Sequence, residues 1–396
     1  MRWGVKDKAD QRMRFVIEAL KERRTMSQLC REFEISRPTG YLWLKRYREG
    51  GKTLSAVVEK SRRPFHSPQR TEEATEKKVL NLREEEGWGS RKIRHVLERD
   101  EGIRLARMTV QRILERHNQI ADLHRHRPAT RRFQRSEPNQ LWQMDFKGQL
   151  PMGNRQCYPL SVLDDYSRFL IGLQALEGTG TEGVHRTLIR VFEHYGLPDE
   201  MLMDHGVPWW NAINQHGLTR LSVNLIKQAI RLRFSGLRHP QTQGKVERFH
   251  GSLLRSIKHH NRWPTSLHAW QQEFARFRQS YNHRRPHESL DMEVPASRYR
   301  HSLRQYQVEP KAWDYPVGSV VRRVNTQGQL SYKGRYLFVS QALDGELVRI
   351  QQVKQTWIIS FRHMWIREIH LDTGTSVPLM AVAEEAMPTD AAMENP

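Results

Sequence analysis

Residues 141–148 read LWQMDFKG and place one acidic side chain, Asp145, inside an otherwise apolar pattern. The run is short and apolar, as expected of a buried strand. A carboxylate in such a strand is costly to bury unless it is paired or binds a metal ion. Asp145 is therefore a candidate for a paired or metal-binding carboxylate.

Two further acids occupy comparable positions. Asp204 ends the apolar stretch MLMDHG, and Glu247 lies in HPQTQGKVERFHGSL, which has a helical pattern. Converging carboxylates suit Mg²⁺ or Mn²⁺, which prefer oxygen ligands. Two such ions ~3.5–4 Å apart can activate an attacking oxygen and stabilise a leaving oxygen. From the residues alone, acids that merely cap turns remain the alternative.

The segment around these acids, residues 139–300, is predicted to be one mixed α/β domain. CYPLSVLDDYS and RFLIGLQAL have strand patterns, TEGVHRTLIRVFEHY is amphipathic, and residues 215–231 and 241–261 are predicted helices. Strands first and helices after them, in one block, are typical of a layered α/β domain.

Five pieces between Leu141 and Leu290 resemble the integrase catalytic core of DDE transposases and retroviral integrases. They are LWQMDFKG, SVLDDYSRFLIG, the DHG turn, HPQTQGKVERFHGSL and YNHRRPHESL, in the family's order. The resemblance implies an RNase H-like fold in which Asp145, Asp204 and Glu247 are the catalytic, metal-binding carboxylates. The interval from Asp204 to Glu247 is longer than is usual in the family, and a surface loop would accommodate the excess.

Other residues near the acids are given structural roles. Asp164 and Asp165, which resemble an acidic pair of the family, are expected to cap a turn rather than bind metal. Trp209 and Trp210 are expected to fill the core, with stacking on an unpaired base as the alternative.

The charge of the chain points to a polyanionic partner. Its 396 residues include 65 Lys and Arg, for a net charge of +21. Nucleic acid is the polyanion that such a balance favours. The two cysteines, Cys30 and Cys157, exclude a disulfide framework or a multi-Cys zinc site. No run approaches the ~20 apolar residues of a membrane span, so we expect a cytoplasmic protein, associated with the nucleoid when bound to DNA.

Two helix-turn-helix domains are predicted ahead of the α/β domain. Residues 1–55 are expected to form the first and residues 71–122 the second, since each has helical periodicity interrupted by a turn. Basic, Pro-containing stretches at 56–70 and 123–138 are expected to be extended linkers. Tandem units of this kind favour a long or two-part DNA site.

Candidate DNA contacts follow from this arrangement. Ser36 is predicted to cap a recognition helix whose exposed leading end carries Arg37, Thr39 and Gly40. The alternative is a helical bundle that contacts no DNA.

Further basic residues could lie on phosphates in the linker and beside the third acid. They are Arg62, Arg63, Lys245, Arg248 and Arg255. Simple solvation is the alternative for each of them.

The C-terminal part alternates with a period of two. Residues 312–373 contain several short strands with glycine turns, which predicts a small SH3-like β-barrel. Residues 374–396 contain acids but no Lys or Arg and are predicted to be a disordered tail.

Together these features predict a transposase that binds double-stranded transposon ends and target DNA. It would cut a strand at each end and join the freed 3′-hydroxyl to target DNA with Mg²⁺ or Mn²⁺, two ions per site. A dimer or tetramer assembled on DNA is expected, and the need for an accessory ATPase is left open. The rivals are a DNA-binding regulator that no longer cleaves, a metal-dependent nuclease without strand transfer, and a chromatin-like architectural protein.

Overall fold

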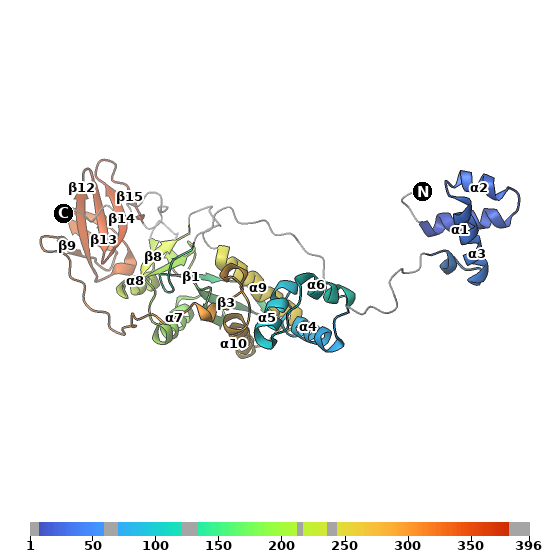
Figure 1. Cartoon of the computed structure of the whole chain (residues 1–396). Coiled ribbons are helices and arrows are strands. Elements are labelled where there is room, and N and C mark those ends of the chain that lie inside the picture. The colour runs from blue at the N-terminus through green and yellow to red at the C-terminus, as the bar shows by residue number, and fades with distance from the viewer. Residues whose placement is uncertain (1–7, 59–69, 121–133, 212–216, 236–243, 380–396) are drawn as a thin grey trace. The chain divides into compact units, whose positions relative to one another are not determined.

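The computed structural model describes residues 8–58, 70–120, 134–211, 217–235 and 244–379. The chain divides into two compact units, Met1–Glu72 and Glu73–Pro396. Figure 1 labels their helices and strands. Among the described residues, no helix has the length and apolar character needed to cross a membrane.

The first unit is a three-helix domain, as predicted. It comprises α1 (Lys8–Leu20), α2 (Met26–Glu32), α3 (Arg37–Glu49) and the short helix η1 (Leu54–Val57). Ser36 caps α3 by accepting a hydrogen bond from the Thr39 N–H, with Pro38 in the first turn. These local signals were readable in the sequence because caps are set by residue type.

One detail of the first unit differs from the prediction. Gly40 is buried rather than exposed, and a Cβ there would lie 2.8 Å from the Sγ of Cys30. The glycine therefore serves the close approach of α2 and α3.

The second helix-turn-helix consists of α4 (Glu73–Glu86), α5 (Ser90–Glu101) and α6 (Arg107–Arg116). Its core includes Ile93, Val96, Leu97, Val110, Ile113 and Leu114. The buried carboxylate of Glu76 pairs with Arg116 at 2.5 Å, which ties α4 to α6.

The α/β domain is built on a six-stranded sheet. Its strands are β1 (Leu141–Phe146), β2 (Leu150–Met152), β3 (Arg155–Asp164), β4 (Leu170–Leu176), β5 (Glu200–Met203) and β8 (Arg231–Phe234). The order is β2-β3-β1-β5-β8, with β4 also on β3. β1, β5 and β8 run parallel, whereas β2, β3 and β4 pair antiparallel.

Helices cover both faces of this sheet. α7 (Thr181–Tyr195) and α8 (Arg220–Lys227) pack on one face, with Val184, Leu188 and Leu225 in the core. α9 (Gly244–His260) and α10 (Leu267–His283) pack on the other, with Val246, Phe249 and Phe274 buried. The helix predicted over 215–231 is shorter than expected, because β7 (Gly217–Leu218) precedes α8 and β8 follows it. β7 pairs with β6 (Trp210–Asn211).

The C-terminal strands do not confirm a closed barrel. In the described residues, β9 (Val320–Arg323), β12 (Leu347–Val353), β13 (Thr356–Phe361), β14 (Met364–His370) and β15 (Ser376–Val377) form an open five-stranded sheet. A separate hairpin joins β10 (Gln329–Tyr332) to β11 (Arg335–Phe338). Because β15 pairs with β14, the start of the predicted disordered tail at 374–396 is ordered. Residues 380–396 lie outside the described residues.

Candidate active site

Asp145 and Asp204 are brought together by the parallel pairing of β1 with β5. Leu141, Trp142 and Gln143 pair with Glu200, Met201 and Leu202. Continuing that register places Asp204 level with Asp145, on strands that lie about 4.8 Å apart. Two acids far apart in sequence therefore meet at the carboxyl end of the sheet.

Glu247 comes from the helix that packs against the same strand. It is exposed and lies in the first turn of α9, and α9 contacts β1. Residues 236–243, which include His239 and Gln243 and lead into α9, lie outside the described residues.

Electrostatics link the three acids. Burial, and then the charge of Asp204, raises the pKa of Asp145 to about 7, and Glu247 adds to the rise. Burial disfavours the ionised form of Asp145, and the like charges of the other two acids add to that effect. The oxygen donors offered here are those that Mg²⁺ and Mn²⁺ prefer. Nevertheless, within the described residues, no three His, Cys, Asp or Glu side chains are gathered closely enough to hold a metal ion together.

His250, which the sequence analysis did not select, connects α9 to the strand that carries Asp145. Its Nε2 lies 2.7 Å from the Ser161 hydroxyl, and that hydroxyl donates to the Asp145 carbonyl at 2.9 Å. Ser161 is also the direct cross-strand partner of Asp145. Burial, and then the charge of Lys147, lowers the pKa of His250 to about 3. The neutral imidazole is one helical turn after Glu247, and that spacing was the signal available in the sequence.

Trp209 contacts the second acid directly. Its indole N–H donates to Asp204 Oδ1 at 2.5 Å, and the Gly206 N–H donates to the same oxygen at 3.0 Å. Its ring is fully buried and stacks on Phe146 at 5.5 Å between centroids. The prediction that Trp209 and Trp210 fill the core is confirmed, and the hydrogen bond to Asp204 was not foreseen.

Trp209→Phe is expected to weaken metal-dependent activity about tenfold, because outer hydrogen-bond partners of metal ligands typically contribute 10–100-fold. Phenylalanine preserves the stacking on Phe146 but removes the donor to Asp204 Oδ1. The measurement is the Mn²⁺ concentration that gives half-maximal activity. Trp210→Phe is the matched control, since the Trp210 ring packs on Phe234 and His205. Equal metal requirements for the two variants would contradict this role.

The acidic pair beside the site has structural contacts. Asp164 accepts hydrogen bonds from the backbone N–H groups of Ser167 and Asn139, which confirms the predicted turn cap. Asp165 accepts from Gln143 and pairs with Lys245. Lys245 is thus held inside the protein by an ion pair that fastens α9 to the end of β3.

The other predicted DNA contacts lie in different parts of the chain. Arg37 is exposed at the start of α3, and the Thr39 hydroxyl forms a hydrogen bond with the Ser36 hydroxyl. Arg248 and Arg255 are exposed on α9. Arg62 and Arg63 lie outside the described residues, as does most of the two linkers.

The comparisons with known proteins identify the domains of the chain. Residues 11–65 match a helix-turn-helix domain and residues 39–114 a homeodomain-like domain. Residues 135–239 and 228–295 match integrase core domains. These matches make the domains of the chain similar to those of insertion-sequence transposases and integrases.

A curated relative is the insertion element IS407 uncharacterized 31.7 kDa protein of Burkholderia multivorans. It is 25% identical over 161 residues, which span 40% of this chain and 54% of that relative. The match thus covers about half the length of the relative.

Solved retroviral structures are also similar to this chain, at low sequence identity. The simian T-cell lymphotropic virus intasome in complex with PP2A regulatory subunit B56 gamma is 13% identical, with a TM-score of 0.38 over 78% of this chain and 100% of that one. The HTLV-2 integrase catalytic core in complex with magnesium, in its trimeric form, is 12% identical, with a TM-score of 0.33 over 42% and 99%.

Proposed function

We propose that this chain is a DDE-type transposase that cleaves DNA at the ends of its element and joins the freed 3′-hydroxyl to target DNA. The observation that carries the proposal is the placement of Asp145 and Asp204 side by side on β1 and β5, with Glu247 on the helix against β1. Two helix-turn-helix domains precede this site in the chain.

The chemistry proposed is a pair of phosphoryl transfers at one site. In the first, water attacks a phosphodiester, the P–O3′ bond breaks, and the 3′-oxygen leaves as a hydroxyl. In the second, that hydroxyl attacks a target phosphodiester and a target 3′-oxygen leaves. Asp145, Asp204 and Glu247 would hold Mg²⁺ or Mn²⁺, and two such ions activate the attacking oxygen and stabilise the leaving oxygen.

The protein's own residues would supply the frame for this chemistry. The Ser161–His250 contacts hold α9 on β1, and Trp209 fixes one oxygen of Asp204. Helix-turn-helix domains bind duplex DNA, mainly through phosphates with a few base contacts. Two element ends must meet for joining, so we propose an oligomer, a dimer or tetramer, that assembles on DNA.

The test is a reaction of the full-length protein with Mg²⁺ or Mn²⁺ and the DNA that flanks its gene, together with a target plasmid. Products in which flanking DNA is joined to the plasmid are expected. Cleavage that never yields joined DNA would instead support a metal-dependent nuclease without strand transfer. Binding of the DNA without cleavage would support a DNA-binding regulator that no longer cleaves.

Asp145→Asn is expected to stabilise the metal-free protein at pH 8 by about 1–3 kcal/mol, because each pKa unit corresponds to ~1.4 kcal/mol. The pKa of Asp145 is raised in the folded protein, so its ionisation costs stability as the pH rises from about 4 through about 7. The gain should shrink as the pH falls toward about 4 and vanish below about pH 3, where the carboxyl is protonated in both the folded and the unfolded state. Thermal unfolding measures the difference.

Binding of a metal ion is expected to reverse the order of stability of the native and Asp145→Asn proteins. Mg²⁺ should raise the unfolding temperature of the native protein and not that of Asp145→Asn. If native and variant proteins unfold alike at pH 8, both with and without Mg²⁺, the three acids do not form a metal site.

A further inference from the structure

A group of three basic side chains lies where the second helix-turn-helix domain meets the α/β domain. Lys92 comes from α5, Arg255 from α9, and Arg285 from the segment after α10. Each of the three interacts electrostatically with the other two. We call them the basic cluster.

The two domains are joined firmly around this cluster. Arg91, next to Lys92, pairs with Glu288 at 2.8 Å. At the end of α4, Glu86 accepts hydrogen bonds from Ser280 at 2.8 Å and Arg284 at 3.0 Å. These contacts hold α4 and α5 against the end of α10.

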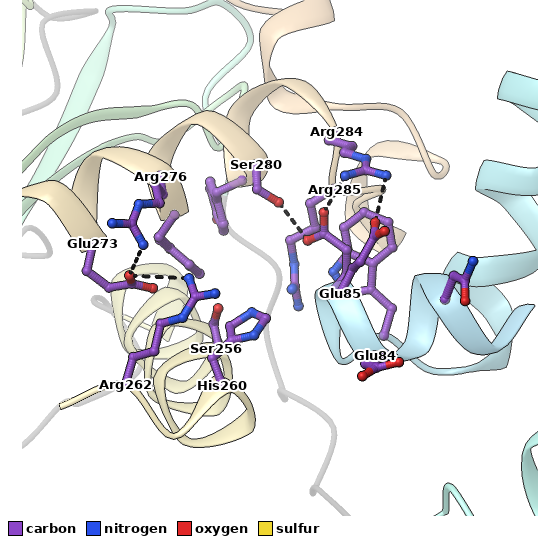
Figure 2. A pocket seen from close by; sticks show the side chains of 15 residues that line it. Glu84, Glu85, Ser256, His260, Arg262, Glu273, Arg276, Ser280, Arg284 and Arg285 are labelled. Carbon is purple, nitrogen blue, oxygen red and sulfur yellow. Dashed lines mark hydrogen bonds and ion pairs between the residues drawn. The ribbon is translucent and has the colours of Figure 1, made fainter. Parts of the chain in front are cut away.

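The acids nearby are already engaged elsewhere. Glu288 forms an ion pair with Arg91, and Glu86 accepts hydrogen bonds from Arg284 and Ser280. Figure 2 shows Arg284 joined to the glutamates at the end of α4, whereas no dashed line reaches Arg285. Among the described residues, the side chains of Lys92 and Arg285 have neither an ion pair nor a hydrogen bond. Glu288 and Glu86 offset part of this positive charge at a distance, but neither of them pairs directly with Lys92 or Arg285.

This concentration is costly in the free protein. Burial, and then the charge of Arg285, lowers the pKa of Lys92 to about 7, with Arg255 adding to the effect. Beside the cluster, the buried Nε2 of His287 has no hydrogen-bond partner in the described residues. Like charges in a partly desolvated place repel one another, and a bound anion would offset that repulsion.

A cavity of about 750 Å³ lies beside the cluster. Of the cluster only Arg285 lines it, together with three other arginines and with Glu84, Glu85, Glu86 and Glu273. Arg255 is exposed, whereas Lys92 and Arg285 are half-buried. Cations from three separate segments thus border the surface near the contact between α5 and the end of α10.

We propose that the basic cluster binds a phosphate of the DNA backbone as the DNA passes from the second helix-turn-helix domain to the active site. The inference rests on the proposed function, because it assumes that DNA occupies both domains. Arg255 and Glu247 lie on the same helix, eight residues apart, which is about 12 Å of axial rise. A phosphate held at the cluster therefore sets the register of a DNA strand a few nucleotides from the acids, at ~3.4 Å per nucleotide.

The test compares end-DNA binding by the native full-length protein and by the double variant Lys92→Gln, Arg285→Gln. Neutralising one phosphate contact should lower the slope of log K against log salt concentration by roughly 0.9, and should weaken binding roughly 3- to 10-fold at moderate salt. The matched control, Arg186→Gln with Arg190→Gln, removes two charges from α7 on the opposite face of the sheet and should keep the native slope.

Single methylphosphonate substitutions along the end DNA locate the contact. The native protein should lose affinity at one phosphate position, and the double variant should be insensitive to the same substitution. The inference would be overturned if the double variant kept the native dependence of log K on log salt concentration and also lost affinity at the same methylphosphonate position as the native protein.

Stability of the free protein separates binding from a structural role. Because the cluster is repulsive, the double variant should unfold at the native temperature or above it, and inorganic phosphate should stabilise only the native protein. A lower unfolding temperature in the variant, with no response of the native protein to phosphate, would overturn the inference. If the native protein joins no DNA but its salt slope still depends on the cluster, the proposed function fails and the phosphate site stands. If it joins DNA and the variant keeps the native slope, only the phosphate site fails.

Discussion

Glu247→Gln is expected to lower strand transfer by about 10³-fold or more, because metal-bound carboxylates support several kcal/mol of transition-state stabilisation and each ~1.4 kcal/mol is tenfold in rate. Binding of end DNA should change little, since the residue is one exposed acid at the start of α9. The same loss is expected for Asp145→Asn and Asp204→Asn. Rates of joined-product formation and a binding assay on the same DNA measure the two effects separately.

The control for this prediction is Glu177→Gln. Glu177 is an exposed acid that forms a surface ion pair with Arg155 at 2.9 Å. Exposed pairs contribute little to stability, ~0–1 kcal/mol, so this variant should join DNA at the native rate. Joining that survives Glu247→Gln would mean that another acid completes the site.

Glu200→Gln is expected to destabilise the protein by about 2–4 kcal/mol, because breaking a buried ion pair on one side leaves uncompensated charges. The Glu200 side chain is 9% exposed at the start of β5 and binds three arginines. Arg233 contacts both of its oxygens, at 2.7 and 2.9 Å, and Arg135 and Arg231 approach from two other sides. The arginines are partly exposed, which keeps the loss below the upper limit for a fully buried pair.

The pH dependence gives this prediction a second test. Burial would raise the pKa of Glu200, but Arg233 and then the other arginines lower it below its usual value. Stability from these pairs is therefore present above the unfolded pKa of about 4.3 and is lost as the pH falls through the folded pKa. The difference between native and Glu200→Gln proteins should shrink below about pH 4.

Thermal or urea unfolding measures the effect, with Glu182→Gln as the control. Glu182 is 83% exposed in an i,i+4 pair with Arg186, so its loss should cost less than ~0.5 kcal/mol. A Glu200→Gln protein as stable as this control would contradict the account of the arginine cluster. Since β5 also leads to Asp204, a strongly destabilised variant should lose strand transfer as well.

Local chemistry explains which parts of the fold could be predicted from the sequence. The cap at Ser36 and the apolar faces of α5 and α6 depend on neighbouring residues, and all of them are confirmed. Strand patterns and the turn cap at Asp164 were readable for the same reason. The burial of Gly40 was missed because it depends on Cys30 and Phe15, which approach it only in the folded domain.

The candidate active site likewise combines features that could be predicted from the sequence with features that depend on the folded structure. Asp145 and Asp204 stand out locally from apolar strand patterns, whereas the choice of Asp145, Asp204 and Glu247 as one set came from the resemblance to the integrase core. The hydrogen bonds from Trp209 to Asp204 and from Ser161 to Asp145 could not be predicted, since they depend on strand register and loop conformation. The internal ion pair of Lys245 with Asp165 depends likewise on how α9 docks, and sequence position alone suggested an exposed cation.

The barrel prediction shows the limit of a period-two pattern. That pattern specifies which residues alternate between faces, but closure requires the first and last strands to pair. In the described residues the five-stranded sheet runs from β15 to β9 without such a pairing.

The most direct test of the proposed function uses a pre-cut element end with either a 3′-hydroxyl or a 3′-hydrogen, full-length protein, Mn²⁺ and a target plasmid. Joined products are predicted for the native protein with the 3′-hydroxyl end alone, and for Glu247→Gln with neither end. Joining of the 3′-deoxy end, or equal joining by native and Glu247→Gln proteins, would contradict a transposase that uses this hydroxyl and these acids.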